Sequence, residues 1–181
     1  MTHSEFQQIF DMVVKDLNDT SWDMTFDLDS CKNYLEIKDS GQKMMYETVY
    51  WLLSAQTLLS IDFSDIQDQF KGYDRMECAI RDCTFDDLER DLTRALEQLI
   101  KEDPLVDTCW LQMCMRLEEF EDMKKKEKYV ELRGDRKVLV FEKIFNSLPI
   151  KHLQWGFGIS QCIESGVKLS VLFGYKISPS D

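Results

Sequence analysis

The sequence has few of the residues that interrupt regular structure or form catalytic motifs. Its 181 residues include only 7 Gly, 3 Pro and 2 His. So few glycines and prolines argue against low-complexity linkers, and no internal repeat is visible. A chain of this length can bury a substantial hydrophobic core as one domain. We therefore expect residues 1–181 to form a single domain.

Long apolar segments and an export signal are also lacking. The first residues are acidic where a secretory signal would be basic, and polar side chains interrupt the most apolar stretch, residues 44–61. These features predict neither a signal peptide nor a membrane span. Without export, the 6 Cys are expected to be reduced and mostly buried. We expect a soluble, cytoplasmic protein, with a nuclear location left open.

No catalytic or cofactor motif is recognisable. The patterns GxGxxG, GxxxxGKS/T, HExxH and GxSxG are absent, and His3 and His152 belong to no nucleophile motif. The segments CAIRDC and CWLQMC place cysteines five positions apart, which separates their side chains by about 140° on a helix. Neither pair can then converge on one metal ion, so core thiols are the better interpretation. We expect no cofactor and no resident metal.

Acidic charge is the strongest global feature, and it is unevenly distributed. The net charge is −12, and residues 1–110 carry 24 acidic against 10 basic side chains, whereas residues 111–181 carry 10 against 12. An acidic surface repels nucleic acids and anionic membranes, so we expect the acidic half to bind neither. A basic cluster at 124–137 is interleaved with acidic residues and is interpreted as a cationic rim. A well-solvated surface is the simplest interpretation of the acidic bias.

Helical periodicity dominates residues 1–126. Apolar residues recur every three or four positions, which predicts about five helices. They are expected at residues 4–18, 42–60, 62–82, 84–103 and 104–126. The third has the weakest pattern, with Gly72 as its expected stop. Ser4 is the expected N-cap of the first helix, with Gln7 at the capping-box position.

Alternating apolar and polar residues indicate strands elsewhere. Residues 22–28 alternate, and residues 34–39 offer a partner for an early β-hairpin. After residue 127, short runs predict about four antiparallel strands. These runs are residues 128–132, 137–141, 152–160 and 167–177. The predicted fold class is α+β, with a mainly helical half at 1–126 and a mainly β half at 127–181 that covers it.

The tripeptide Arg133-Gly134-Asp135 has the composition of an adhesion ligand. It joins two strand-like runs at a point where a residue that accepts positive φ is needed, and Gly134 supplies it. An adhesion ligand also requires export, which the sequence does not predict. We therefore interpret the tripeptide as the corner of a β-hairpin.

Two features exceed what a small core requires: the acidic bias, and a supply of 9 Met, 11 Phe and 4 Trp. Together they favour a non-enzymatic interaction domain, an acidic inhibitor, immunity-type or adaptor protein that docks on a basic partner surface. The candidate partner-binding residues are Asp62, Asp65, Asp68, Asp82, Asp86 and Asp87. One alternative is an obligate subunit whose apolar face is covered by a partner or a second copy. The other is a metal-dependent hydrolase that uses aspartates of residues 62–91.

The hairpin interpretation can be tested by two substitutions. Gly134→Val should destabilise the protein by about 1 kcal/mol or more, because a β-branched residue is strained at positive φ. Asp135→Glu, which removes the adhesion motif, should leave folding and partner binding unchanged. Chemical denaturation of both variants checks this, and equal tolerance of the two substitutions would contradict the hairpin corner.

Overall fold

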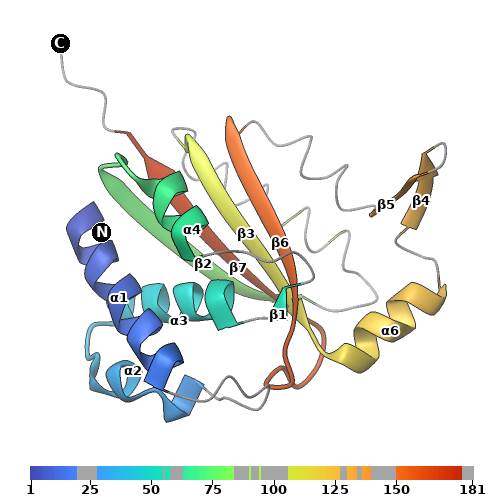
Figure 1. Ribbon diagram of the computed structural model, residues 1–181, viewed down its shortest axis with the longest axis horizontal. Coiled ribbons are helices and arrows are strands. Elements are labelled where there is room, and N and C mark those ends of the chain that lie inside the picture. Colours follow the sequence, from blue (N-terminus) through green and yellow to red (C-terminus); the bar gives the residue numbers. More distant parts are fainter. Residues whose placement is uncertain are drawn as a thin grey trace.

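A computed structural model of the chain shows helices packed on a mixed β-sheet (Figure 1). The structure describes residues 1–19, 28–54, 56–57, 63–83, 90, 94, 106–126, 130–133, 136–139 and 150–176. The helices are α1 (His3–Asp19), a short 3₁₀-helix (Leu28–Ser30), α2 (Lys32–Glu36), α3 (Ser40–Ser54), α4 (Phe63–Phe70) and α6 (Leu117–Lys126). The strands are β1 (Gln56–Thr57), β2 (Arg75–Cys83), β3 (Thr108–Met115), β4 (Val130–Arg133), β5 (Arg136–Leu139), β6 (His152–Ile159) and β7 (Val167–Tyr175). The predicted α+β class is confirmed.

The main sheet has five strands in the order β1-β6-β3-β7-β2. β3 lies in the middle, parallel to β6 and antiparallel to β7, and β2 pairs with β7 on the outside. The predicted sheet of about four antiparallel C-terminal strands is therefore wrong in its pairing. The strand positions agree, but β3 separates β6 from β7, and β4 pairs with β5 in a second sheet. Periodicity identifies a strand from its own side chains, whereas its neighbours depend on the rest of the chain.

The β4–β5 pair confirms the predicted hairpin around the adhesion-like tripeptide. The two strands are antiparallel, with Arg133 opposite Arg136. Gly134 and Asp135 lie outside the described residues, so the conformation of the corner stays a prediction.

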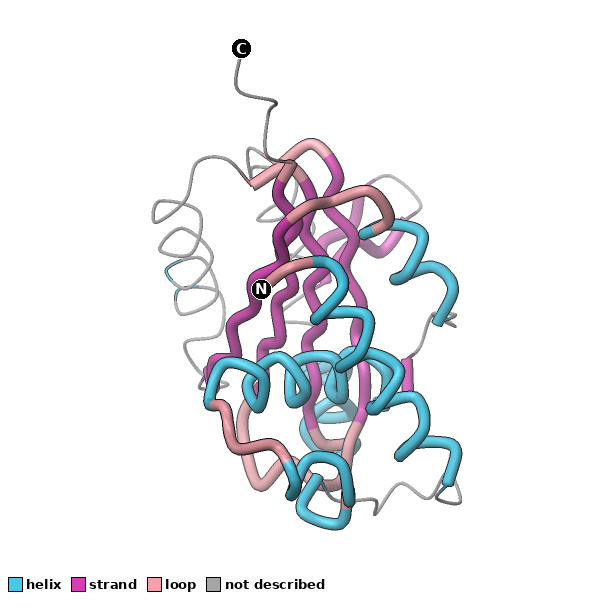
Figure 2. Tube along the Cα trace, turned by 90° about the vertical axis from the view of Figure 1, so that its left-hand side faces the viewer, coloured by secondary structure: helices cyan, strands magenta, loops and turns pink. Residues whose placement is uncertain are grey.

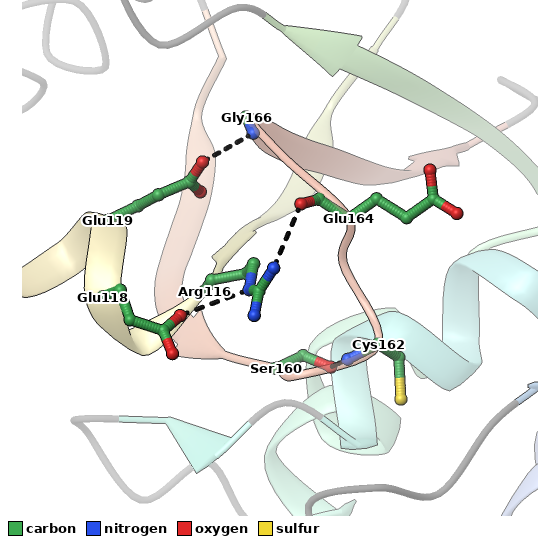
Figure 3. Close-up of polar contacts among 7 residues, drawn as sticks. All are labelled: Arg116, Glu118, Glu119, Ser160, Cys162, Glu164 and Gly166. Atoms are coloured by element: carbon green, nitrogen blue, oxygen red, sulfur yellow. Dashed lines mark hydrogen bonds and ion pairs between the residues drawn. The ribbon is translucent and has the colours of Figure 1, made fainter.

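The connection from β6 to β7 crosses the C-terminal end of β3 (Figure 3). Arg116 follows β3, and its Nη1 donates to the carbonyl oxygen of Glu164 at 3.4 Å, while its Nε pairs with Glu118 at 3.2 Å. The Gly166 N–H donates to Glu119 at 3.1 Å. Gly166 has a φ of 75°, which favours glycine. The turn that contains Gly166 therefore spans β3 instead of joining adjacent strands.

β3 contradicts the helix predicted over residues 104–126. Thr108–Met115 is a strand, and a helix begins only at Leu117. All eight residues of β3 are buried. A strand covered on both faces carries a near-continuous apolar run, so its sequence shows no period of two and can be mistaken for a helix.

Two further segments differ from the predicted elements. The weak helical pattern over 62–82 contains a helix only as far as Phe70, and Arg75–Cys83 is a strand. Gly72, with a φ of 83°, lies between them as the predicted helix stop. The second strand of the predicted early hairpin is instead the helix α2. Residues 20–27 and most of 84–103 lie outside the described part of the chain.

The N-cap of helix α1 lies two residues before the predicted Ser4 cap. Thr2 is the N-cap: its Oγ1 accepts a hydrogen bond from the Glu5 N–H at 3.3 Å, and Glu5 Oε2 accepts one from the Thr2 N–H at 2.8 Å. This reciprocal pair is a capping box. Thr2-Glu5 and Ser4-Gln7 both fit that motif, and the structure uses the first because Thr2 also bridges to Arg75 of β2.

Apolar side chains cover both faces of the sheet. On one face, α1, α3 and α4 pack against β2, β3 and β7, as the side view in Figure 2 shows. This core includes Phe6, Phe10, Tyr46, Trp51, Phe70, Trp110 and Leu172. The second core occupies the other face, where Phe120 of α6 lies 5.4 Å from Phe157 between ring centroids.

The cysteines and the helices agree with two further expectations. All six cysteines are free, and Cys31, Cys83, Cys109 and Cys114 are buried. The prediction that the thiols are mostly buried is confirmed. Among the helices that the structure describes, none combines the length and apolar character needed to cross a bilayer.

Asp16 is a buried carboxylate that joins α1, α2 and α3. Only 6% of the residue is exposed. It accepts hydrogen bonds from the Tyr46 hydroxyl at 2.6 Å, the Asn33 N–H at 3.0 Å and Asn33 Nδ2 at 2.6 Å. These bonds compensate for the lost hydration of the carboxylate. Burial, followed by the bond to Asp16, raises the pKa of Tyr46, so its hydroxyl stays a donor.

Gly174 in β7 allows a close approach between strands and α4. A Cβ atom at this position would lie 2.6 Å from Thr108 Cγ2, 3.0 Å from the Phe70 ring and 3.1 Å from the Tyr73 ring. Thr108 is buried, and its Oγ1 donates to the His152 carbonyl oxygen at 3.0 Å. The neighbouring atoms are therefore held in place, and the site requires glycine.

Removing the Asp16 carboxylate should destabilise the fold. Asp16→Ala leaves the buried Tyr46 hydroxyl without this acceptor, so we expect the free energy of unfolding to fall by about 2–3 kcal/mol. Asp11→Ala is a matched control on the same helix, because Asp11 is exposed, and should change it by less than about 0.5 kcal/mol. Urea denaturation measures both. The double variant Asp16→Ala, Tyr46→Phe should lose less stability than the sum of the two single losses. Strictly additive losses would argue against the hydrogen bond between Tyr46 and Asp16.

Gly174→Ala should destabilise the protein by about 1–3 kcal/mol, because the new methyl group overlaps the Thr108 methyl group. Thr108→Ser removes that methyl group and keeps the hydroxyl, so in this background Gly174→Ala should cost clearly less. Gly41→Ala, at an exposed position early in α3, brings its Cβ to 3.3 Å from the flexible Asp39 side chain, so it should cost clearly less than Gly174→Ala. Thermal unfolding compares the variants, and a failure of Thr108→Ser to rescue would exclude the contact as the cause.

Candidate functional site

The predicted partner-binding aspartates do not form one surface among the described residues. Asp65 and Asp68 are exposed on α4 and line the same groove. Asp82 lies near the end of β2, where it forms an ion pair with Lys168 at 2.8 Å. The remaining three, Asp62, Asp86 and Asp87, lie outside the described residues.

Asp65 and Asp68 belong to what we call the sheet-end groove, at the N-terminal ends of β3 and β6. Its volume is about 820 Å³. It is lined by Asp65, Asp68, Gln69, Lys71, Tyr73, Lys151, His152, Leu153, Gln154 and Lys176. Three lysines therefore oppose the two aspartates, so the groove has no strong charge of one sign.

Hydrogen bonds organise the floor of the sheet-end groove. Lys151 Nζ lies 3.1 Å from Asp107, and the Tyr73 hydroxyl donates to Asp107 at 3.2 Å. The hydrogen bond from Lys151 lowers the pKa of Asp107, so this carboxylate stays ionised. Burial, with the nearby Asp107 charge, raises the pKa of Tyr73, so its phenol stays protonated. Neither group is poised to exchange protons near neutral pH.

The hydrolase alternative requires several aspartates around one ion. Within the part of the chain that the structure describes, no group of three His, Cys, Asp or Glu side chains is arranged to hold a metal. Asp62, which with Asp65 and Asp68 recurs every third residue, lies outside that part. Asp65 and Asp68 therefore supply two carboxylates beside lysines, which is a weak metal environment.

A second groove, which we call the β2-edge groove, lies where the N-terminus, the start of α3 and β2 meet. Its volume is about 540 Å³. It is lined by Met1, Glu5, Asp39, Gly41, Gln42, Met44, Met45, Met76, Glu77 and Cys78. Four methionines and three acidic residues thus line one groove, with no lysine, arginine or histidine among its lining residues.

The three acidic residues of the β2-edge groove are positioned by local contacts. Glu5 belongs to the α1 capping box, whose hydrogen bonds from Thr2 lower the pKa of its carboxyl group. Asp39 caps α3 by accepting a hydrogen bond from the Gln42 N–H at 2.9 Å. Glu77 pairs with Arg75 at 2.8 Å and accepts a hydrogen bond from the Tyr175 hydroxyl at 3.2 Å, so its carboxylate lies toward the other face of the sheet. Glu5 and Asp39 therefore have fixed places at the rim.

The floor of the β2-edge groove is apolar and chemically unreactive. Met45 and Met76 are buried, whereas 42% of Met44 is exposed. Burial raises the pKa of the Cys78 thiol to about 11, so it is neither a thiolate nucleophile nor a ready metal ligand near neutral pH. The arrangement suits binding and not covalent chemistry.

The surplus of methionine is evident in the sequence, but this groove is not. Glu5, Asp39 and Glu77 were not candidates, because none belongs to a dense acidic run. The available signals were the carboxylates at two helix starts, since such residues lie at predictable positions. No local signal indicated that both helix starts adjoin β2.

Comparison of the chain with models of known protein families and with curated proteins gave no match in either case.

Proposed function

We propose that this protein is a non-enzymatic interaction domain, an acidic inhibitor, immunity-type or adaptor protein that docks on a basic surface of a partner protein. The observation that carries the proposal is the β2-edge groove, which is lined by three acidic residues and four methionines. The free cysteines support a reducing compartment, and we propose the cytoplasm.

Lysine and arginine have the chemistry that complements this groove. Their alkyl stems can lie along the methionine thioethers while the charged ends reach Asp39 or Glu5. Methionine is flexible and polarisable, so its side chains adapt to partners of different shape. The exposed side chain of Met44 makes such contacts available at the surface.

The other candidate surfaces support docking less well. In the sheet-end groove, lysines offset Asp65 and Asp68, and Lys168 offsets Asp82. The obligate-subunit alternative needs a continuous apolar face. The large exposed apolar residues in the described ranges are Met12, Leu35, Met44 and Leu117. They lie on four different helices, and scattered apolar residues are normal on protein surfaces.

Neutralising the groove carboxylates should slow association with the partner without unfolding the protein. In the triple variant Glu5→Gln, Asp39→Asn and Glu77→Gln, each new side chain can still accept hydrogen bonds, including those that cap α1 and α3. Electrostatic attraction accelerates encounter and is screened over about 8 Å at physiological ionic strength. We therefore expect the association rate constant to fall at least about tenfold, with a smaller change in dissociation.

The measurement begins with affinity capture from the native host at low and high salt, which identifies the retained protein. Surface plasmon resonance then compares the triple variant with a control, Asp11→Asn, Asp19→Asn and Glu36→Gln, which removes the same number of charges from exposed positions. Equal slowing in both variants would exclude this groove as the docking site. Association that is indifferent to salt between about 50 and 500 mM and to all six substitutions would contradict the charge-led function.

A further inference from the structure

We propose that β2 accepts an extended, basic segment of the partner as an additional strand at the edge of the sheet. This inference rests on the proposed function and specifies how the β2-edge groove is occupied. β2 is an outer strand of the main sheet, and nine consecutive pairs, from Arg75↔Tyr175 to Cys83↔Val167, align it with β7 without a bulge. A straight outer strand presents a regular row of N–H and C=O groups with which another strand can pair.

The hydrogen bonds of Met76 identify which groups of β2 face outward. In an antiparallel pair, alternate residues direct both of their backbone groups to the same neighbour. The Met76 N–H donates to the Met1 carbonyl oxygen at 2.8 Å, so Met76 faces away from β7. Alternation then places the backbone groups of Cys78, Ile80 and Asp82 on the same outer edge. Counting only residues that the structure describes, the N–H groups of these three have no backbone acceptor.

The chain already uses this edge for a very short strand addition. Thr2 forms an antiparallel bridge with Arg75, and the His3 N–H donates to the Asp74 carbonyl oxygen at 3.3 Å. Helix α1 then leads the chain away from the sheet, and Figure 2 shows the N-terminus lying beside the strands. This pairing reaches Met76 and does not extend to Cys78. Residues 78–82 lie on the same edge of β2, so an added strand there would extend the pairing that residues 1–3 make.

The β2-edge groove lies where side chains of an added strand would point. Side chains of a strand alternate between the two faces of its sheet. Those directed to the α3 side would contact Met76 and Cys78 of β2 and Met44 of α3, all of which line the groove. Asp39 and Glu5 at the rim favour lysine or arginine in those positions. The occupant that this arrangement fits is a strand with basic and apolar residues.

Charge complementarity also separates this occupant from a second copy of the chain. Two copies paired through β2 would bring together two chains that each carry a net charge of −12. Like charges across an interface oppose association. A basic segment gains attraction at the same place, so we commit to a partner strand.

The test uses a blocked, fluorescent ten-residue peptide of alternating lysine and valine and two N-methylated isomers of it. One isomer carries N-methyl groups on every lysine and the other on every valine, so both keep all side chains and charges. Only one edge of the peptide can face β2, and methyl groups on that edge remove its main-chain donors. Fluorescence anisotropy should show at least about tenfold weaker binding for one isomer and little change for the other.

Hydrogen exchange and two variants locate the strand. On adding the unmodified peptide, amide exchange at Cys78, Ile80 and Asp82 should slow at least about tenfold, whereas Ala79 and Arg81, which face β7, should change little. Ile80→Pro removes an outward N–H without removing a β2–β7 hydrogen bond, and should weaken peptide binding at least about tenfold. Asp82→Pro tests the same edge at an exposed residue if Ile80→Pro fails to fold.

The outcomes separate this inference from the proposed function. Equal binding of both isomers and unchanged exchange at β2 would overturn strand addition, and salt-sensitive binding would then leave acidic docking in place. Weaker binding of one isomer and slowed exchange at β2 would support strand addition. If the unmodified peptide then binds the Glu5→Gln, Asp39→Asn and Glu77→Gln variant as tightly as the unaltered protein, the charge-led function is contradicted. Absence of binding by any of the three peptides at millimolar concentration would also overturn strand addition.

Discussion

Every residue of β3 is buried, and the other elements are arranged to cover it. A strand buried on both faces needs hydrogen-bonding neighbours on both edges, because its backbone groups have no access to water. β6 and β7 supply those edges, while α1, α3 and α4 cover one face and Phe120 contributes to the other. The connection between β6 and β7 must then cross the end of β3. Arg116 and Glu119 hold it there by hydrogen bonds to Glu164 and Gly166.

The central position of β3 also determines which strands are left on the outside. β1 has two residues and offers little backbone for pairing, whereas β2 has nine. Long, straight outer strands are usually protected, and among the described residues Met1 and Thr2 pair with only the beginning of β2. New main-chain hydrogen bonds can form along the remainder without rearranging either core. Of the two outer strands, β2 therefore offers the longer edge for main-chain pairing with another strand.

The negative rim of the β2-edge groove arises from requirements of the backbone. Carboxylates are favoured at helix N-termini, where they cap free N–H groups and interact favourably with the helix dipole. Glu5 and Asp39 meet this requirement for α1 and α3, and both helices begin beside β2. Two separate caps therefore add to one local potential. The aspartates selected from charge density, by contrast, are dispersed: Asp65 lies near lysines and Asp82 pairs with Lys168.

The sequence by itself determined the α+β class, the positions of α1, α3 and the C-terminal strands, and the burial of free thiols, because side-chain spacing and composition are local properties. It did not reveal β3, since a strand buried on both faces has no alternation, or α2, whose residue Asn33 bonds to the distant Asp16. The order of strands and the β2-edge groove were decided only by tertiary structure. That groove unites residues 1–5, 39–45 and 76–78, and spacing within a segment carries no information about its distance from another segment.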